Sequence, residues 1–113
     1  MMYESKRDRV NWVYIMTNCW HTTFYTGSTS NIVSRIQDHK MRLNEGFTKK
    51  YNLDKLIWFE VVDDMDTALR REDRIKHWIV PWKVELIEKL NPDWKDLFDE
   101  AKLSMAREGA FGA

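Results

Sequence analysis

Residues 12–27 read WVYIMTNCWHTTFYTG and carry the strongest secondary-structure signal in the chain. Two runs rich in aromatic and β-branched residues, 12–17 and 22–27, flank the four residues 18–21, a pattern typical of a β-hairpin. If Thr17 and Thr22 close this loop, antiparallel pairing sets Tyr14 directly opposite Tyr25 on one face of the sheet. A loop two residues longer or shorter would leave the two tyrosines as diagonal neighbours. The sequence therefore predicts two phenols side by side.

The segment that follows predicts a helix, which Thr29 or Ser30 can cap. Its apolar stripe consists of Ile32, Ile36 and Leu43. Arg35 and His39 are four residues apart on this helix, so they lie one above the other on one flank. That flank is expected near the strand from which Tyr25 projects.

Glu72 stands on the apolar face of a second amphipathic helix. The stretch 65–79 carries apolar residues at helical spacing: Met65, Ala68, Leu69, Ile75 and Ile79. A carboxylate held away from water without a cation costs several kcal/mol or more, so Glu72 is expected to have a cationic partner. By itself this pattern also fits an ion-pair partner or a solvated boundary residue.

The remaining segments complete a single domain. Residues 56–62 predict a third strand, a helix after Pro81 is stopped by Asn91 and Pro92, and a last helix includes Leu97 and Ala101. We expect one domain over 1–113, with a core of about 12–98 and a disordered tail of about 106–113. Five tryptophans are interpreted as core anchors, and Trp20 in the hairpin loop is the exception.

Composition limits the possible functions. The chain has 113 residues, a charged start at 1–9 and no long apolar run, which argues against secretion or membrane insertion and favours the cytoplasm. One cysteine, Cys19, cannot form an internal disulfide. With so few Cys and His residues a structural zinc site is not expected, and any metal should be oxygen-ligated.

The charge balance argues against a strong duplex binder, because Lys plus Arg and Asp plus Glu number 18 each. Residues 30–55 nevertheless form a basic strip with two aromatic residues. Its members are Arg35, Lys40, Arg42, Phe47, Lys49, Lys50, Tyr51 and Lys55. This strip fits either a path for a phosphate backbone or a solvated loop, and weak, non-specific affinity is expected.

The tyrosines, Arg35, His39 and Glu72 together suit hydrolysis of a phosphodiester. A divalent cation on a carboxylate polarises a phosphoryl oxygen, and an arginine neutralises charge on the phosphorus oxygens. A tyrosine or histidine can accept the proton of the attacking water, although a phenol needs a nearby cation to do so at neutral pH.

These residues, in this order, resemble the GIY-YIG nuclease domain over about residues 12–97. The matching positions are Val13-Tyr14-Ile15, Tyr25-Thr26-Gly27, Asn31, Arg35, His39 and Glu72. The segments 46–51 and 90–97 resemble the small, stand-alone bacterial branch of the family. The departures are Val13 for glycine, Thr26 for isoleucine, and Ser28 where some members carry a lysine.

The resemblance implies an α+β fold, a three-stranded antiparallel sheet flanked by helices, with a single Mg²⁺ or Mn²⁺ site and water as nucleophile. Tyr14 or Tyr25 would be the base, Arg35 would hold the scissile phosphate, and His39 would assist. Glu72 would ligate the metal, and Asn91 would be the family's late asparagine.

Three functions remain open at this point. The first is a metal-dependent endonuclease acting on branched, damaged or single-stranded DNA, as in repair or recombination. The second is a catalytically idle nucleic-acid-binding or interaction module on the same scaffold, and the third is a phosphodiesterase for small nucleotides. A homodimer is compatible with cutting both strands, but no residue pattern requires one.

Overall fold

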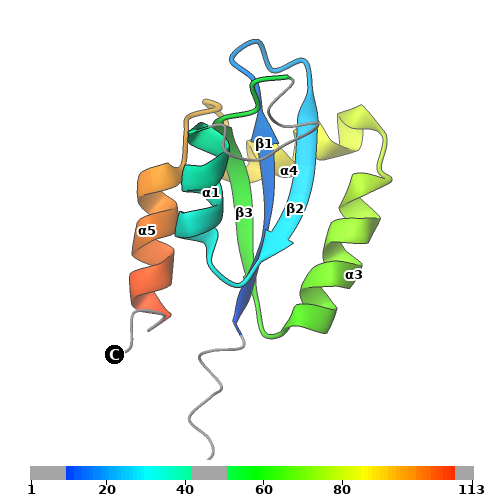
Figure 1. Ribbon diagram of the computed structural model, residues 1–113. Helices are drawn as coiled ribbons and strands as arrows, with labels where there is room; N and C mark the ends of the chain where they lie inside the picture. The colour runs from blue at the N-terminus through cyan, green and yellow to red at the C-terminus, as the bar shows by residue number, and fades with distance from the viewer. Residues whose placement is uncertain (1–9, 42–50, 109–113) are drawn as a thin grey trace, which may run out of the picture.

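The protein is built on a three-stranded antiparallel sheet. The computed structural model describes residues 10–41 and 51–108. In the sheet the strands β1 (Asn11–Thr17), β2 (Phe24–Thr29) and β3 (Lys55–Val62) are arranged in the order β2-β1-β3 (Figure 1). Every residue of the central strand β1 is buried, which explains why β1 reads as a nearly continuous apolar run.

Helices cover both faces of this sheet, so that the predicted α+β class is confirmed. On one face lie α1 (Ile32–Lys40) and α5 (Phe98–Arg107), and on the other lie α3 (Met65–Lys76) and α4 (Val80–Leu90) (Figure 1). Successive side chains of β1 point to opposite faces of the sheet and belong to two separate hydrophobic cores. Trp12, Tyr14 and Met16 pack with α1 and α5, whereas Val13 and Ile15 pack with residues of α3 and α4.

The hairpin register differs from the expected one. Tyr14 pairs with Gly27, and Tyr25 pairs with Met16, so the tyrosines are diagonal neighbours and not directly opposed. The last pair is Thr17 with Phe24, which leaves the six residues 18–23 in the loop. Because the shift is two residues, both tyrosines still lie on the same face.

The first helix begins later than the sequence suggested. Asn31 is the N-cap of α1, and its Oδ1 atom accepts a hydrogen bond of 2.9 Å from the Ser34 N–H, so neither Thr29 nor Ser30 caps this helix. The predicted stop of α4 at Asn91 is observed. Residues 106 and 107 of the expected tail belong to α5, and 109–113 lie outside the described residues.

The apolar stripe of α3 is only partly buried. Ala68 and Ile75 are buried, but Met65 and Leu69 are exposed, and Ile79 lies beyond the helix as the exposed N-cap of α4. The reason is position: α3 packs mainly along β2, which is an edge strand, so part of its apolar face overhangs the sheet. Within the described residues, no helix is both long and apolar enough to span a bilayer.

Candidate active site

Three rings gather between β1, β2 and α1. The centroid of Tyr14 lies 6.3 Å from that of Tyr25 and 5.8 Å from that of His39, and Tyr25 and His39 are 5.6 Å apart. The Tyr14 hydroxyl and His39 Nε2 are 3.1 Å apart and form a buried hydrogen bond. The predicted proximity of the two phenols and His39 is therefore observed.

Burial keeps the Tyr14–His39 pair uncharged at neutral pH. It raises the pKa of Tyr14 well above its ordinary value, and neighbouring Tyr25 raises this pKa further, while the charge of Arg35 opposes the shift. Burial, together with the charge of Arg35, lowers the pKa of His39 to about 4. The Nδ1 atom of His39 has no hydrogen-bond partner among the described residues.

Gly27 provides the space for the Tyr14 ring. A Cβ atom at position 27 would lie 2.6 Å from the Tyr14 hydroxyl oxygen and 2.9 Å from the Tyr25 ring. Such contacts are far inside van der Waals distance, and the Tyr14 hydroxyl is already fixed by His39. The glycine of this motif therefore serves close packing of the two phenols.

Glu72 of α3 faces the same region from the edge of the sheet. Its side chain is 17% exposed, and its two oxygens have separate partners. The Ser28 hydroxyl donates to Oε1 at 2.6 Å, and the Lys76 ammonium donates to Oε2 at 3.0 Å. The expected cation is therefore Lys76, four residues further along the helix.

Glu72 and Arg35 are close enough to the phenols to interact with them through their charges. The charges of both residues act on Tyr14, with Arg35 also lowering the Tyr14 pKa through hydrogen bonding. The charge of Lys76 in turn interacts with Tyr25. Tyr14, Tyr25, Arg35, His39 and Glu72 thus form one neighbourhood contributed by β1, β2, α1 and α3.

Sequence reasoning missed Lys76, and it named Ser28 only as a departure from the family motif, without its contact to Glu72. The spacing of Glu72 and Lys76 is the i, i+4 spacing of helical ion pairs, so Lys76 could have been found from the sequence. The contact of Ser28 with Glu72 had no signal in the sequence, because it depends on how α3 packs against β2.

The donor set fits a hard divalent cation held by one protein carboxylate. Among the described residues no group of three His, Cys, Asp or Glu side chains could hold a metal ion. Mg²⁺ does not require such a group, because it retains several waters and commonly uses one or two carboxylates plus substrate phosphates. The oxygen ligand available for such an ion is Glu72, whose partner Lys76 is half-exposed.

Asn91 is occupied by the backbone around it. Its amide nitrogen donates to Ile57 O at 3.0 Å and to Lys95 O at 2.8 Å, and its Oδ1 accepts from Lys95 N at 3.0 Å. Asn91 is buried and caps the end of α4. Through these hydrogen bonds Asn91 connects the end of α4 to β3. Its catalytic role stays a prediction.

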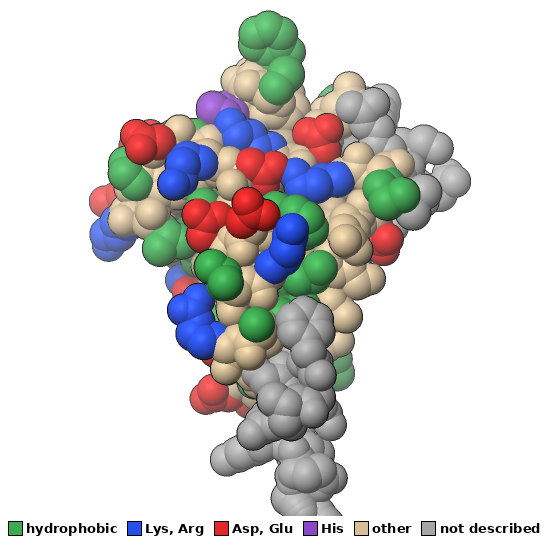
Figure 2. All heavy atoms as spheres, turned by 90° about the vertical axis from the view of Figure 1, so that its left-hand side faces the viewer, with side chains coloured by type: hydrophobic (Ala, Val, Ile, Leu, Met, Phe, Trp, Pro, Cys, Tyr) green, Lys and Arg blue, Asp and Glu red, His purple; other side chains and the backbone are tan. Residues whose placement is uncertain are grey.

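The basic strip is represented by few described residues. Lys40 is ion-paired with Asp96 and donates to Asp54 O, so its charge is partly neutralised. Tyr51 is exposed, whereas Lys49 and Lys50 lie outside the described residues. Figure 2, which faces α1 and α5, shows basic and acidic side chains interspersed and no uniform basic field.

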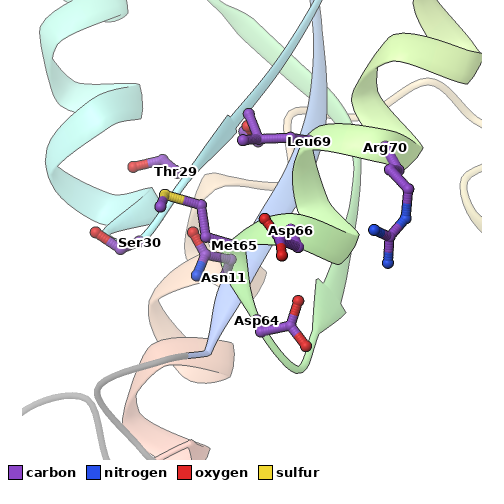
Figure 3. A pocket seen from close by; sticks show the side chains of 9 residues that line it. Asn11, Thr29, Ser30, Asp64, Met65, Asp66, Leu69 and Arg70 are labelled. Atoms are coloured by element: carbon purple, nitrogen blue, oxygen red, sulfur yellow. The ribbon is translucent and has the colours of Figure 1, made fainter.

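A cavity of about 710 Å³ lies between the end of β2 and the start of α3. In Figure 3, Met65 reaches from α3 toward Thr29 and Ser30, while Arg70 points away on the other side of the helix. Ser28 also lines this cavity, but Tyr25 lies near the opposite end of β2. We therefore place the site at the rings and Glu72 and not in this cavity.

Fold and site together define a GIY-YIG domain. The family model described as the GIY-YIG catalytic domain matches residues 10–96, and the chain belongs to this family. Relatives of this chain include UPF0213 proteins. One from Syntrophus aciditrophicus (strain SB) is 39% identical over 84 residues, which is 74% of this chain and 94% of that protein. UPF0213 protein SH2523 from Staphylococcus haemolyticus (strain JCSC1435) is 32% identical over 79 residues, 70% of this chain and 95% of that protein.

A solved structure shows the same fold. The solution NMR structure of UPF0213 protein BH0048 from Bacillus halodurans aligns with a TM-score of 0.50 and 22% sequence identity. The alignment covers 77% of this chain and 92% of that protein. The expected family, its small stand-alone branch and the fold class are therefore confirmed. Membership of a catalytic-domain family suggests a nuclease, and the names of the relatives state no activity.

Proposed function

We propose that this protein is a divalent-metal-dependent endonuclease that hydrolyses phosphodiester bonds of DNA with water as the nucleophile. The observation that carries the proposal is the convergence on Tyr14: a second phenol, an imidazole, a guanidinium and a carboxylate all act on its hydroxyl. A module that only binds nucleic acid has no need of a half-buried carboxylate beside two phenols.

The residues divide the chemistry among them. Arg35, exposed on α1, neutralises the scissile phosphate. Tyr25 is half-buried beside the Lys76 charge. As a phenolate it would accept a proton from the attacking water and become the neutral phenol. The buried Tyr14–His39 pair positions Tyr25 and the phosphate. Glu72 would hold Mg²⁺ or Mn²⁺, which supplies polarisation of a phosphoryl oxygen and stabilisation of the leaving group.

The test is a nicking assay on supercoiled plasmid and on branched DNA with Mg²⁺ or Mn²⁺. Glu72→Gln and Arg35→Ala are each expected to lower the rate by about 10²–10³-fold, because each removes a group that stabilises charge in the transition state. Matched controls are Asp73→Asn and Arg74→Ala, which change exposed residues of α3 and should retain activity.

Two outcomes would contradict the proposal. Activity that survives both Glu72→Gln and Arg35→Ala would reject the mechanism. A folded wild-type protein that cuts no plasmid, branched or single-stranded substrate with either metal would favour the catalytically idle module. Thermal melts followed by circular dichroism show that each variant is folded.

A further inference from the structure

Trp20 is presented to solvent at the tip of the β1–β2 hairpin. Its side chain is 79% exposed, more than any other large hydrophobic residue in the described part of the chain. Single exposed apolar residues are ordinary on protein surfaces, so exposure alone assigns no role. The hydrogen bonds that hold the loop, and the position of the loop near Tyr25, support a role for Trp20.

The loop that carries Trp20 is fixed on both sides. On one side, the Asn18 side chain accepts hydrogen bonds from the Thr22 N–H at 2.9 Å and the Thr23 N–H at 3.4 Å. On the other, His21 stacks on Trp94 with centroids 4.6 Å apart and accepts from the Lys55 ammonium at 3.0 Å. Asn18 and His21 thus hold the loop, and Trp20 at its tip faces solvent beside the exposed Cys19.

The hairpin tip is at the end of the proposed active site that holds Tyr25. Tyr25 is the second residue of β2, directly after the loop, and in Figure 1 the loop projects beyond the upper ends of β1 and β2. A cavity of about 430 Å³ next to the tip is lined by Cys19, Lys40, Asp54, Lys55 and Asp96. Lys40, which lines this cavity, directly follows His39 of the ring group along α1.

We propose that Trp20 stacks on an unpaired base of a DNA strand whose backbone continues toward Tyr25. An exposed indole on a fixed loop offers a π-face, and stacking on it is tolerant of sequence. In intact duplex both faces of each base are covered by neighbouring bases, so the platform favours substrates with single-stranded nucleotides beside the cut. This inference rests on the proposed function and names its substrate class.

The test measures binding without cleavage, with EDTA in place of metal. The full-length protein is titrated into three DNAs: a single strand, a gapped duplex carrying 2-aminopurine in the gap, and the fully paired duplex. Stacking on Trp20 should quench the 2-aminopurine fluorescence. Trp20→Ala should abolish the quench and raise the Kd for gapped and single-stranded DNA about 5- to 150-fold, since stacking contributes about that factor per base. Binding to the paired duplex should not change.

Two variants control for other effects. Trp82→Ala removes a different exposed indole, on α4, and should behave as wild type. Trp20→Phe keeps a smaller π-face and should restore most of the affinity and quench.

The proposal is overturned if Trp20→Ala binds every DNA as wild type does, or if Trp82→Ala has the same effect. A change in molar mass by light scattering on Trp20→Ala, without loss of DNA binding, would assign the tip to a second copy of the chain and overturn it also. A Trp20-dependent quench in a protein that cuts nothing would support base stacking while rejecting the nuclease. Normal cleavage by a protein whose DNA binding does not depend on Trp20 would support the nuclease and reject base stacking.

Discussion

Tyr14 and Tyr25 differ in their surroundings although they are neighbours. Tyr14 is completely buried, and burial raises its pKa, so the hydroxyl keeps its proton. Tyr25 is half-buried and lies within the field of the Lys76 charge. The sequence could not separate their roles, because both residues sit in equivalent motifs and burial is decided by the helix that covers them.

The first prediction separates these roles by removing one hydroxyl at a time. Tyr25→Phe should lower kcat by about 10²–10⁴-fold with little change in Tm, because it removes the proton acceptor. Tyr14→Phe should lower kcat less but destabilise the fold by about 1–3 kcal/mol, since His39 Nε2 loses its buried partner. Nicking rates and thermal melts of both variants test this. A stable, inactive Tyr14→Phe beside an active Tyr25→Phe would reverse the assignment.

The second prediction concerns Lys76, which occupies one oxygen of Glu72. Replacing Lys76 with Met should tighten divalent-metal binding about twofold to fivefold, because an exposed ion pair of this kind contributes up to about 1 kcal/mol that a metal must displace. Calorimetric titration with Mn²⁺ measures the affinity directly. Lys102→Met is the control, because it removes an equally exposed ammonium whose partner is Asp99 on α5. Equal affinities in all three proteins would show that Lys76 does not compete with the metal.

At the level of elements, the alternation of β1 and β2 predicted which side chains share a face but not the register. The turn is set by Asn18, whose side-chain oxygen replaces a strand partner for the Thr22 and Thr23 N–H groups and lengthens the loop to six residues. A side-chain hydrogen bond of this kind is invisible to a count of apolar positions. The two tyrosines still share one face of the sheet, because the observed register differs from the predicted one by an even number of residues.

For helix α3 the sequence pattern predicted which residues share a face but not how far that face is buried. Its periodicity predicted a buried face, yet Leu69 is 50% exposed, since α3 lies along the edge strand. Glu72 on that face is consequently reachable from solvent, which a site for a phosphodiester requires. Tertiary packing, and not helical spacing, determined how far each position is covered.

The third prediction tests strand β2 through Thr26, which stands where the family motif has isoleucine. The Thr26 side chain is 3% exposed, and its Oγ1 has no hydrogen-bond partner among the described residues. Thr26→Val keeps the β-branched shape and removes a buried hydroxyl, so it should stabilise the protein by about 1 kcal/mol. Chemical denaturation measures the change. Destabilisation by a similar amount would mean that the hydroxyl has a partner, such as a bound water.

At the scale of the whole molecule, His39 couples the sheet to α1 and makes folding sensitive to pH. Its ordinary pKa is 6.5, and burial and Arg35 lower it to about 4 in the folded protein, against a smaller opposing effect of Asp38. Tyr14 and Tyr25 are the rings that face it from the sheet. Between these two pKa values the unfolded chain therefore binds a proton that the folded chain does not.

The fourth prediction follows from this difference in proton binding. Stability from His39 is fully present above pH 6.5 and is lost as pH falls toward 4, with a total effect of about 3 kcal/mol. Urea denaturation of wild type and His39→Gln at pH 7.5 and pH 4.5 isolates this contribution, because other acidic groups titrate in both proteins. The stability advantage of the wild type should shrink by about 2–3 kcal/mol between the two pH values. His77→Gln, at an exposed histidine, should track the wild type. A constant gap between wild type and His39→Gln would show that the imidazole can be protonated without disturbing its contact with Tyr14.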